Sequence, residues 1–80
     1  MGRLHRIGNT EVRVYANDHL PAHFHIVGPD DEALIELATM AVLKGRVAGR
    51  AAQAAYAWAT ASRPLLVAEW NRVNPRFPTA

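Results

Sequence analysis

The hydrophobic periodicity of this chain changes once, near Arg50, and that change limits the folds that the chain can adopt. Before this point apolar residues alternate with polar ones, as Val12 and Val14 do on either side of Arg13. Such a period of two is typical of strands that bury one face. After this point the segment RAAQAAYAWATAS is rich in alanine and lacks proline and glycine, which favours a helix. The sequence therefore predicts strands first and helices afterwards.

Turn-forming segments divide the N-terminal part into short strands. GNT at residues 8–10 and GPDD at residues 28–31 have the composition of turns. The candidate strands are LHRI, EVRVYA, HFHIV, EALIEL and a last short one at residues 40–44, closed by Gly45. Because the connections are short, we expect an antiparallel meander of three to five strands over roughly residues 3–44.

Two helices are expected over roughly residues 50–73. Gly49 marks the start of the first, whose buried stripe is predicted to be Ala51, Ala55, Trp58 and Ala61. Pro64 cannot continue that helix, but Ser62 is suited to cap a second one with Leu66, Trp70 and Val73 buried. Both tryptophans are expected to anchor the core, and the two prolines of NPRFPTA predict a frayed tail at residues 74–80. The expected fold is α+β, a single domain over residues 1–80 with both helices on one face of the sheet.

Composition excludes several classes of protein. The chain has no cysteine, so a disulfide framework and a thiolate metal site are excluded. No apolar run reaches the length of a signal peptide or a membrane span, so we expect a cytoplasmic protein without membrane attachment. Much of the apolar content is alanine, which buries little area, so a small protein partner or a homo-oligomer would stabilise the fold. The net charge is only +2 with dispersed arginines, which argues against a nucleic-acid-binding regulator, kept as an alternative.

Three of the four histidines lie within seven positions, at His19, His23 and His25. Pro21 disfavours a helix here, so we expect a turn through residues 18–21 that leads into a strand at His23. On that strand Phe24 points to one face, and His23 and His25 project from the other with Cβ atoms about 6–7 Å apart. Two imidazoles at this separation are able to share one metal ion.

Two functional interpretations of this cluster stay open, beside a third in which the histidines bind nothing and Asn17 and Asp18 only form the turn. In the first, His19, His23 and His25 bind Zn²⁺, Mn²⁺, Fe²⁺ or Ni²⁺, Asp18 orients the turn or one ring, and Glu32 or Glu36 faces them from the next strand. In the second, two histidines act as general base and acid of a small hydrolase or ribonuclease, and Arg13 neutralises a phosphate.

The motif Asp-His-Leu-Pro-Ala-His-Phe-His at residues 18–25, followed by EALIEL and a helical region with tryptophan, resembles a known family. It is similar to the short bacterial proteins described as domain of unknown function 4160, whose motif usually has a second proline where Ala22 stands. The resemblance runs from about Ile7 to Trp70. It implies no defined activity. Because members often lie beside another small protein, it implies a partner-binding module of a toxin–antitoxin-like pair, with the histidine cluster as its polar site.

Overall fold

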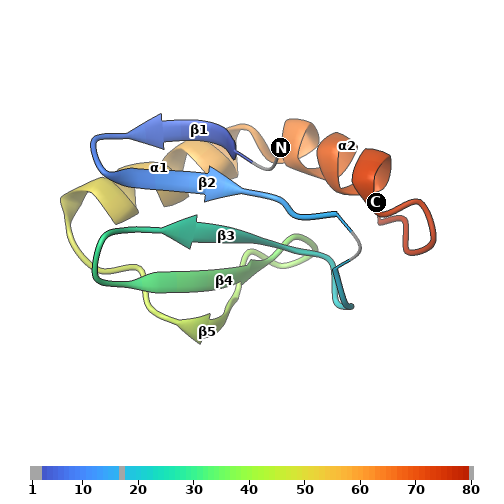
Figure 1. Ribbon diagram of the computed structural model, residues 1–80, viewed down its shortest axis with the longest axis horizontal. Helices are drawn as coiled ribbons and strands as arrows, with labels where there is room; N and C mark the ends of the chain where they lie inside the picture. Colours follow the sequence, from blue (N-terminus) through green and yellow to red (C-terminus); the bar gives the residue numbers. More distant parts are fainter. Residues whose placement is uncertain (1–2, 17, 80) are drawn as a thin grey trace.

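The computed structural model describes residues 3–16 and 18–79, which form a five-stranded sheet followed by two helices (Figure 1). The elements are β1 (Arg3–Ile7), β2 (Thr10–Arg13), β3 (His23–Val27), β4 (Glu32–Glu36), β5 (Val42–Gly45), α1 (Arg50–Ala61) and α2 (Arg63–Val73). Neighbouring strands are antiparallel and their order in the sheet is that of the sequence. The predicted α+β meander with two C-terminal helices is confirmed.

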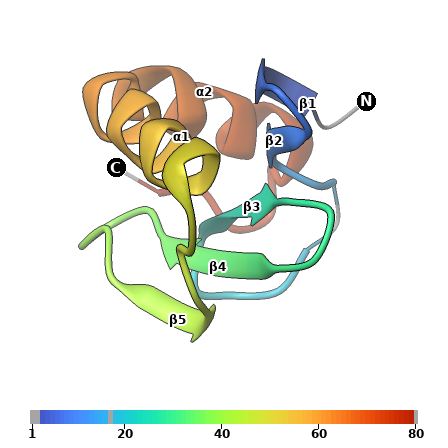
Figure 2. The same cartoon turned by 90° about the vertical axis from the view of Figure 1, so that its left-hand side faces the viewer.

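The helices cover one face of the curved sheet, and the core lies between these two layers (Figure 2). Phe24 and Ile26 of β3 point into this core and are at most 2% exposed, whereas His25 between them is only partly buried. Ile35 of β4, the cross-strand partner of Phe24, is also fully buried. The predicted alternation therefore places the core on one face and leaves His25 on the other.

Helix α1 presents alanines to the sheet, and this differs from the predicted stripe. Its buried residues are Ala52, Ala55 and Ala59. Ala51 and Trp58 are only partly buried and Ala61 is exposed. Because alanine is small, α1 is able to lie close over β1, β2 and β3. Trp58 packs at the margin of the core, where its ring stacks on that of His5 with centroids 4.1 Å apart. Of the two tryptophans predicted to anchor the core, Trp70 is therefore the one that is fully buried.

Helix α2 carries the fully buried Leu66 and Trp70, as predicted, and the tail after it folds back along it. The Nε1–H of Trp70 donates to the carbonyl of Phe77 at 2.7 Å. The Asn71 side chain exchanges two hydrogen bonds with the backbone of Thr79, at 3.0 and 2.8 Å. The expectation of a frayed tail is therefore not met over residues 74–79, because polar groups of α2 bind its backbone.

Strand β5 forms one edge of the sheet and ends at Gly45, as predicted. Gly45 has a φ of 72°, and a Cβ atom there would overlap the carbonyl oxygen of Glu32, so only glycine fits this position. Val42 and Leu43 are 46% and 45% exposed on this edge strand. Within residues 3–16 and 18–79, neither helix is long and apolar enough to cross a membrane.

Candidate metal centre

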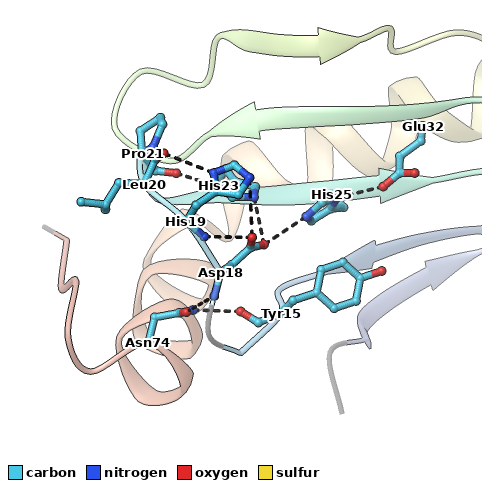
Figure 3. Close-up of polar contacts among 9 residues, drawn as sticks. All are labelled: Tyr15, Asp18, His19, Leu20, Pro21, His23, His25, Glu32 and Asn74. Atoms are coloured by element: carbon cyan, nitrogen blue, oxygen red, sulfur yellow. Dashed lines mark hydrogen bonds and ion pairs between the residues drawn. The ribbon is translucent and has the colours of Figure 1, made fainter.

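The segment between β2 and β3 brings three polar side chains of the predicted cluster together (Figure 3). This segment is not helical, which agrees with the effect predicted for Pro21, and the Leu20–Pro21 peptide bond is cis. It places Asp18 against the rings of His23 and His25, which project from the same side of β3. The turn role expected for Asn17 lies outside the described residues.

The three side chains approach one another through one carboxylate oxygen and two ring nitrogens. Asp18 Oδ2 lies 3.0 Å from His23 Nε2 and 3.4 Å from His25 Nε2. The three candidate ligand atoms all lie within 4.8 Å of one another. Ligand atoms bound to one Zn²⁺ at about 2.0–2.1 Å, with angles of about 90–110°, lie about 2.9–3.4 Å apart. The two separations from Asp18 therefore match those of ligands around a common cation.

The second nitrogen of each imidazole is fixed by an acceptor behind the ring. His23 Nδ1 lies 2.7 Å from the carbonyl oxygen of Pro21, and His25 Nδ1 lies 2.9 Å from Glu32 Oε2. Because a carbonyl and a carboxylate only accept hydrogen bonds, we assign the hydrogen of each neutral ring to Nδ1. Each Nε2 then presents its lone pair to Asp18. Acceptors in this position typically orient histidines that bind metal ions.

The Nε2 atom of His23 is buried and has no hydrogen-bond partner among the described residues. The His23 side chain is fully buried, with its ring centroid 5.5 Å from that of Trp70. Asp18 Oδ2 is close, but it lies off the direction in which Nε2 would form a hydrogen bond. A buried lone pair beside a carboxylate is unfavourable unless a proton or a cation lies between them. The residues present therefore fit a divalent cation.

The Asp18 carboxyl group is held in its charged form. Burial alone would raise its pKa, but a hydrogen bond from the His19 backbone N–H, at 2.9 Å to Oδ1, opposes this effect. The neighbouring imidazoles of His23 and His25 act in the same direction as this hydrogen bond, and the pKa of Asp18 lies below its ordinary value. Asp18 is therefore an anion at neutral pH, as a metal-binding carboxylate must be.

His19 belongs to the predicted ligand set, but the structure does not bring it into the group of three. Its side chain is 72% exposed, and its Nδ1 lies 3.2 Å from the carbonyl oxygen of Leu20. Its Nε2 lies 3.8 Å from Asp18 Oδ1, and its ring stacks at 4.9 Å on that of His23. His19 thus contributes its backbone N–H to Asp18 while its imidazole stays at the solvent side.

The two other predicted binding residues lie on the same face of the sheet but are engaged elsewhere. Arg13 pairs with His25 in the sheet register, yet its guanidinium binds Glu11 at 2.7 and 2.6 Å. Glu36 lies opposite His23 on β4, yet its Oε1 accepts the Thr39 hydroxyl at 2.6 Å. Among the described residues the group of candidate metal ligands contains neither of them.

Asn74 is a residue of this site that the sequence did not reveal. Its Oδ1 accepts the backbone N–H of Asp18 at 2.8 Å, and its Nδ2 donates to the carbonyl of Tyr15 at 2.9 Å. The local signal at Asn74 was that of a residue after a helix end, followed by Pro75, which indicates a helix cap. No local pattern predicts its contact with a loop 56 residues earlier in the chain.

Comparison with known proteins adds one finding to this geometry. A family model with the description "Domain of unknown function (DUF4160)" matches residues 10–71, well over half of the chain. The matched region includes the three candidate ligands, and Asn74 lies just beyond it. Comparisons with curated proteins and with solved structures gave no match.

Proposed function

The chain belongs to the DUF4160 family, and on that premise we propose that it binds a divalent metal ion through Asp18, His23 and His25. The observation that carries this proposal is the buried Nε2 atom of His23, which has no hydrogen-bond partner among the described residues and lies 3.0 Å from a charged carboxylate. Two imidazole nitrogens and one carboxylate oxygen suit Zn²⁺, Fe²⁺, Mn²⁺ and Ni²⁺. Such a bound cation would satisfy all three groups at once.

An ion pair between protonated His23 and Asp18, without a metal ion, explains fewer of the observed contacts than a metal site does. It accounts for the short distance between the two side chains, but a proton on Nε2 would favour a direct hydrogen bond, which this geometry lacks. It also gives no role to Glu32, which holds His25 Nδ1 and turns the other nitrogen of that ring toward Asp18. The metal proposal uses every one of these contacts.

Three protein ligands leave at least one coordination position for water or for a substrate group, as in catalytic rather than structural zinc sites. The Asp18 and His25 side chains are 19% and 12% exposed, so solvent reaches this side of the centre. This supports a metal-dependent hydrolase as the second candidate function, in which the cation would lower the pKa of a bound water. A ribonuclease gains less support, because Arg13, the expected phosphate contact, is paired with Glu11.

Association with a small protein partner or a second copy stays a prediction, and one observation favours it. Val42 and Leu43 are nearly half exposed on the edge strand β5. Light scattering after size exclusion tests self-association. A Leu43→Lys variant with a lower mass than the wild-type species supports it, and a monomer in both proteins contradicts it.

A toxin–antitoxin role and a cytoplasmic location also stay predictions. The regulator alternative gains nothing, because Arg3, Arg13, Arg46 and Arg72 lie in ion pairs with acidic side chains.

The metal proposal is tested on untagged protein stripped with a chelator and dialysed against Zn²⁺, Fe²⁺, Mn²⁺ or Ni²⁺. We expect one equivalent of metal per chain by elemental analysis, and its loss in His23→Ala and in His25→Ala. His5→Ala is the matched control, because His5 stacks on Trp58 outside the group of candidate ligands. Sub-stoichiometric metal that none of these substitutions alters would contradict the proposal.

A further inference from the structure

The segment that carries Asp18 belongs to no helix or strand, so its position depends on contacts with other parts of the fold. Asn74, at the end of α2, makes two such contacts through its side chain (Figure 3). It accepts a hydrogen bond from the Asp18 N–H at 2.8 Å and donates one to the Tyr15 carbonyl at 2.9 Å. The side-chain amide of Asn74 therefore fixes the backbone at Asp18 and at Tyr15, which lies three residues earlier.

Asn74 is itself held firmly. It is only 2% exposed, and both polar atoms of its side chain are satisfied by these two bonds. Its backbone N–H donates to the carbonyl of Trp70 at 2.7 Å, and its own carbonyl accepts the N–H of Phe77 at 3.0 Å. A buried side chain with every polar group paired has little freedom to move, so it transmits the position of α2 to the Asp18 backbone.

The last turn of α2 also contacts His23, the buried candidate ligand. Asn74 is the C-cap of α2 four residues after Trp70, and its backbone N–H donates to the Trp70 carbonyl. The Trp70 ring packs against the ring of His23, and the Asn74 amide binds the backbone of Asp18. The C-terminal end of α2 thereby contacts both a ligand on β3 and the backbone of a ligand in the preceding segment.

We propose that Asn74 is the positioning residue of the metal centre: it holds Asp18 where its carboxylate completes the ligand set with His23 and His25. This inference rests on the proposed metal site and deepens it. Residues that orient metal ligands from behind alter affinity by about 10–100-fold when they are replaced. We expect Asn74→Ala to weaken metal binding by a factor in this range, because the segment with Asp18 then loses both of its bonds to α2.

Asn71 provides a matched control on the same helix. Its amide also makes two hydrogen bonds to backbone groups, but these belong to Thr79 of the tail and not to the segment with Asp18. Asn71→Ala therefore removes the same chemical groups, and we expect it to leave metal affinity within about twofold of the wild type, since it touches no ligand. Asn74→Asp provides a second variant of nearly unchanged size, which is still able to accept from Asp18 but no longer donates to Tyr15.

The experiment uses the full chain with Trp58→Phe, which leaves Trp70 as the single tryptophan beside His23. Quenching of Trp70 fluorescence by Co²⁺ gives the dissociation constant, and circular dichroism at the same temperature confirms that each variant is folded. The result expected is a Co²⁺ affinity at least tenfold weaker in Asn74→Ala and measurably weaker in Asn74→Asp, with Asn71→Ala near the wild type.

Three results would overturn the inference. Equal affinity in the wild type and both Asn74 variants shows that Asn74 does not position Asp18, while the metal site itself stands. An equal loss of Co²⁺ affinity in Asn71→Ala and Asn74→Ala shows that both substitutions act by destabilising the fold and not by displacing Asp18. If Asn74→Ala is unfolded, a folded Asn74→Leu, which is of similar size and makes neither bond, takes its place, and a wild-type affinity in that variant decides against the proposal. No Co²⁺ binding by the wild type, in contrast, refutes the proposed function from which this inference starts.

Discussion

The Nε2 atom of His23 and the Oδ2 atom of Asp18 lie 3.0 Å apart without a hydrogen bond between them. The first atom is fixed by β3 and the second by a segment that is hydrogen-bonded to Asn74 at the end of α2, so a shift of one of these elements would be needed to separate them. Such an arrangement of polar atoms in a buried place costs free energy in the absence of a cation or a proton. The predictions below follow from this relationship.

Replacement of His23 by phenylalanine separates the metal interpretation from a structural ion pair. In metal-free protein we expect His23→Phe to change the free energy of unfolding by less than about 1 kcal/mol. The lost hydrogen bond from Nδ1 to the Pro21 carbonyl is offset by the removal of an unsatisfied buried nitrogen, and a ring is kept beside Trp70. The same variant is expected to lose metal binding. Urea denaturation of both proteins in chelator measures the difference. A loss of about 3–5 kcal/mol would instead indicate that His23 and Asp18 form a buried charged pair.

Glu32 and Glu36 form a matched pair for the outer contacts of the site. Glu32→Gln removes the carboxylate behind His25, so we expect metal affinity to fall roughly tenfold. The Glu32 side chain is 51% exposed, so the stability of the metal-free protein should hardly change. Glu36→Gln is the control, because the Glu36 carboxylate accepts the Thr39 hydroxyl and lies outside the group of candidate ligands among the described residues. Isothermal titration with Zn²⁺ compares them, and an equal effect of both substitutions would argue against the assigned role of Glu32.

The ion pair of Arg13 and Glu11 predicts a dependence of stability on pH. The hydrogen bond from Arg13 is the main cause that holds the pKa of Glu11 below its ordinary value of 4.5. A carboxyl group with a lowered pKa in the folded state stabilises the fold above its ordinary pKa and loses this contribution as the pH falls. We expect Glu11→Gln to be slightly less stable than the wild type at pH 7 and equal to it well below pH 4. Thermal unfolding across this range would show a constant difference if the pair had no such role.

The order of strands and helices was predictable because periodicity is a local property of the sequence. Alternation at Phe24 and Ile26 predicts which face of β3 is buried, and it therefore also places His23 and His25 together on the opposite face. The contact of Asp18 with both rings follows partly from the same motif, because the turn at Pro21 reverses the chain just before β3. These features depend on residues that are close in sequence.

The remainder of the site depends on packing between distant segments. Asn74 reaches Asp18 only because α2 lies across the end of the sheet, and that position is set by the burial of Leu66 and Trp70. The outward direction of His19 depends on rotamers and on the backbone bond to Asp18, which no spacing rule encodes. Likewise, Glu36 has the expected register but binds its own turn. Long-range packing and side-chain competition therefore explain the differences between expectation and structure.

Metal binding should stabilise the whole fold, because the unfolded chain does not hold its three ligands together. With free Zn²⁺ at about 100 times the dissociation constant, a single site adds about 2.7 kcal/mol to the free energy of unfolding. For a domain of 80 residues this corresponds to a rise in melting temperature of roughly 10–20 °C. Calorimetry of the metal-free protein, before and after addition of Zn²⁺, measures the rise in melting temperature, and excess chelator should reverse it.

Asp18→Asn keeps the size of the side chain but loses the anionic ligand, so its melting temperature should respond much less to Zn²⁺. An equal rise in Asp18→Asn and in the wild type would mean that Zn²⁺ binds elsewhere on the chain.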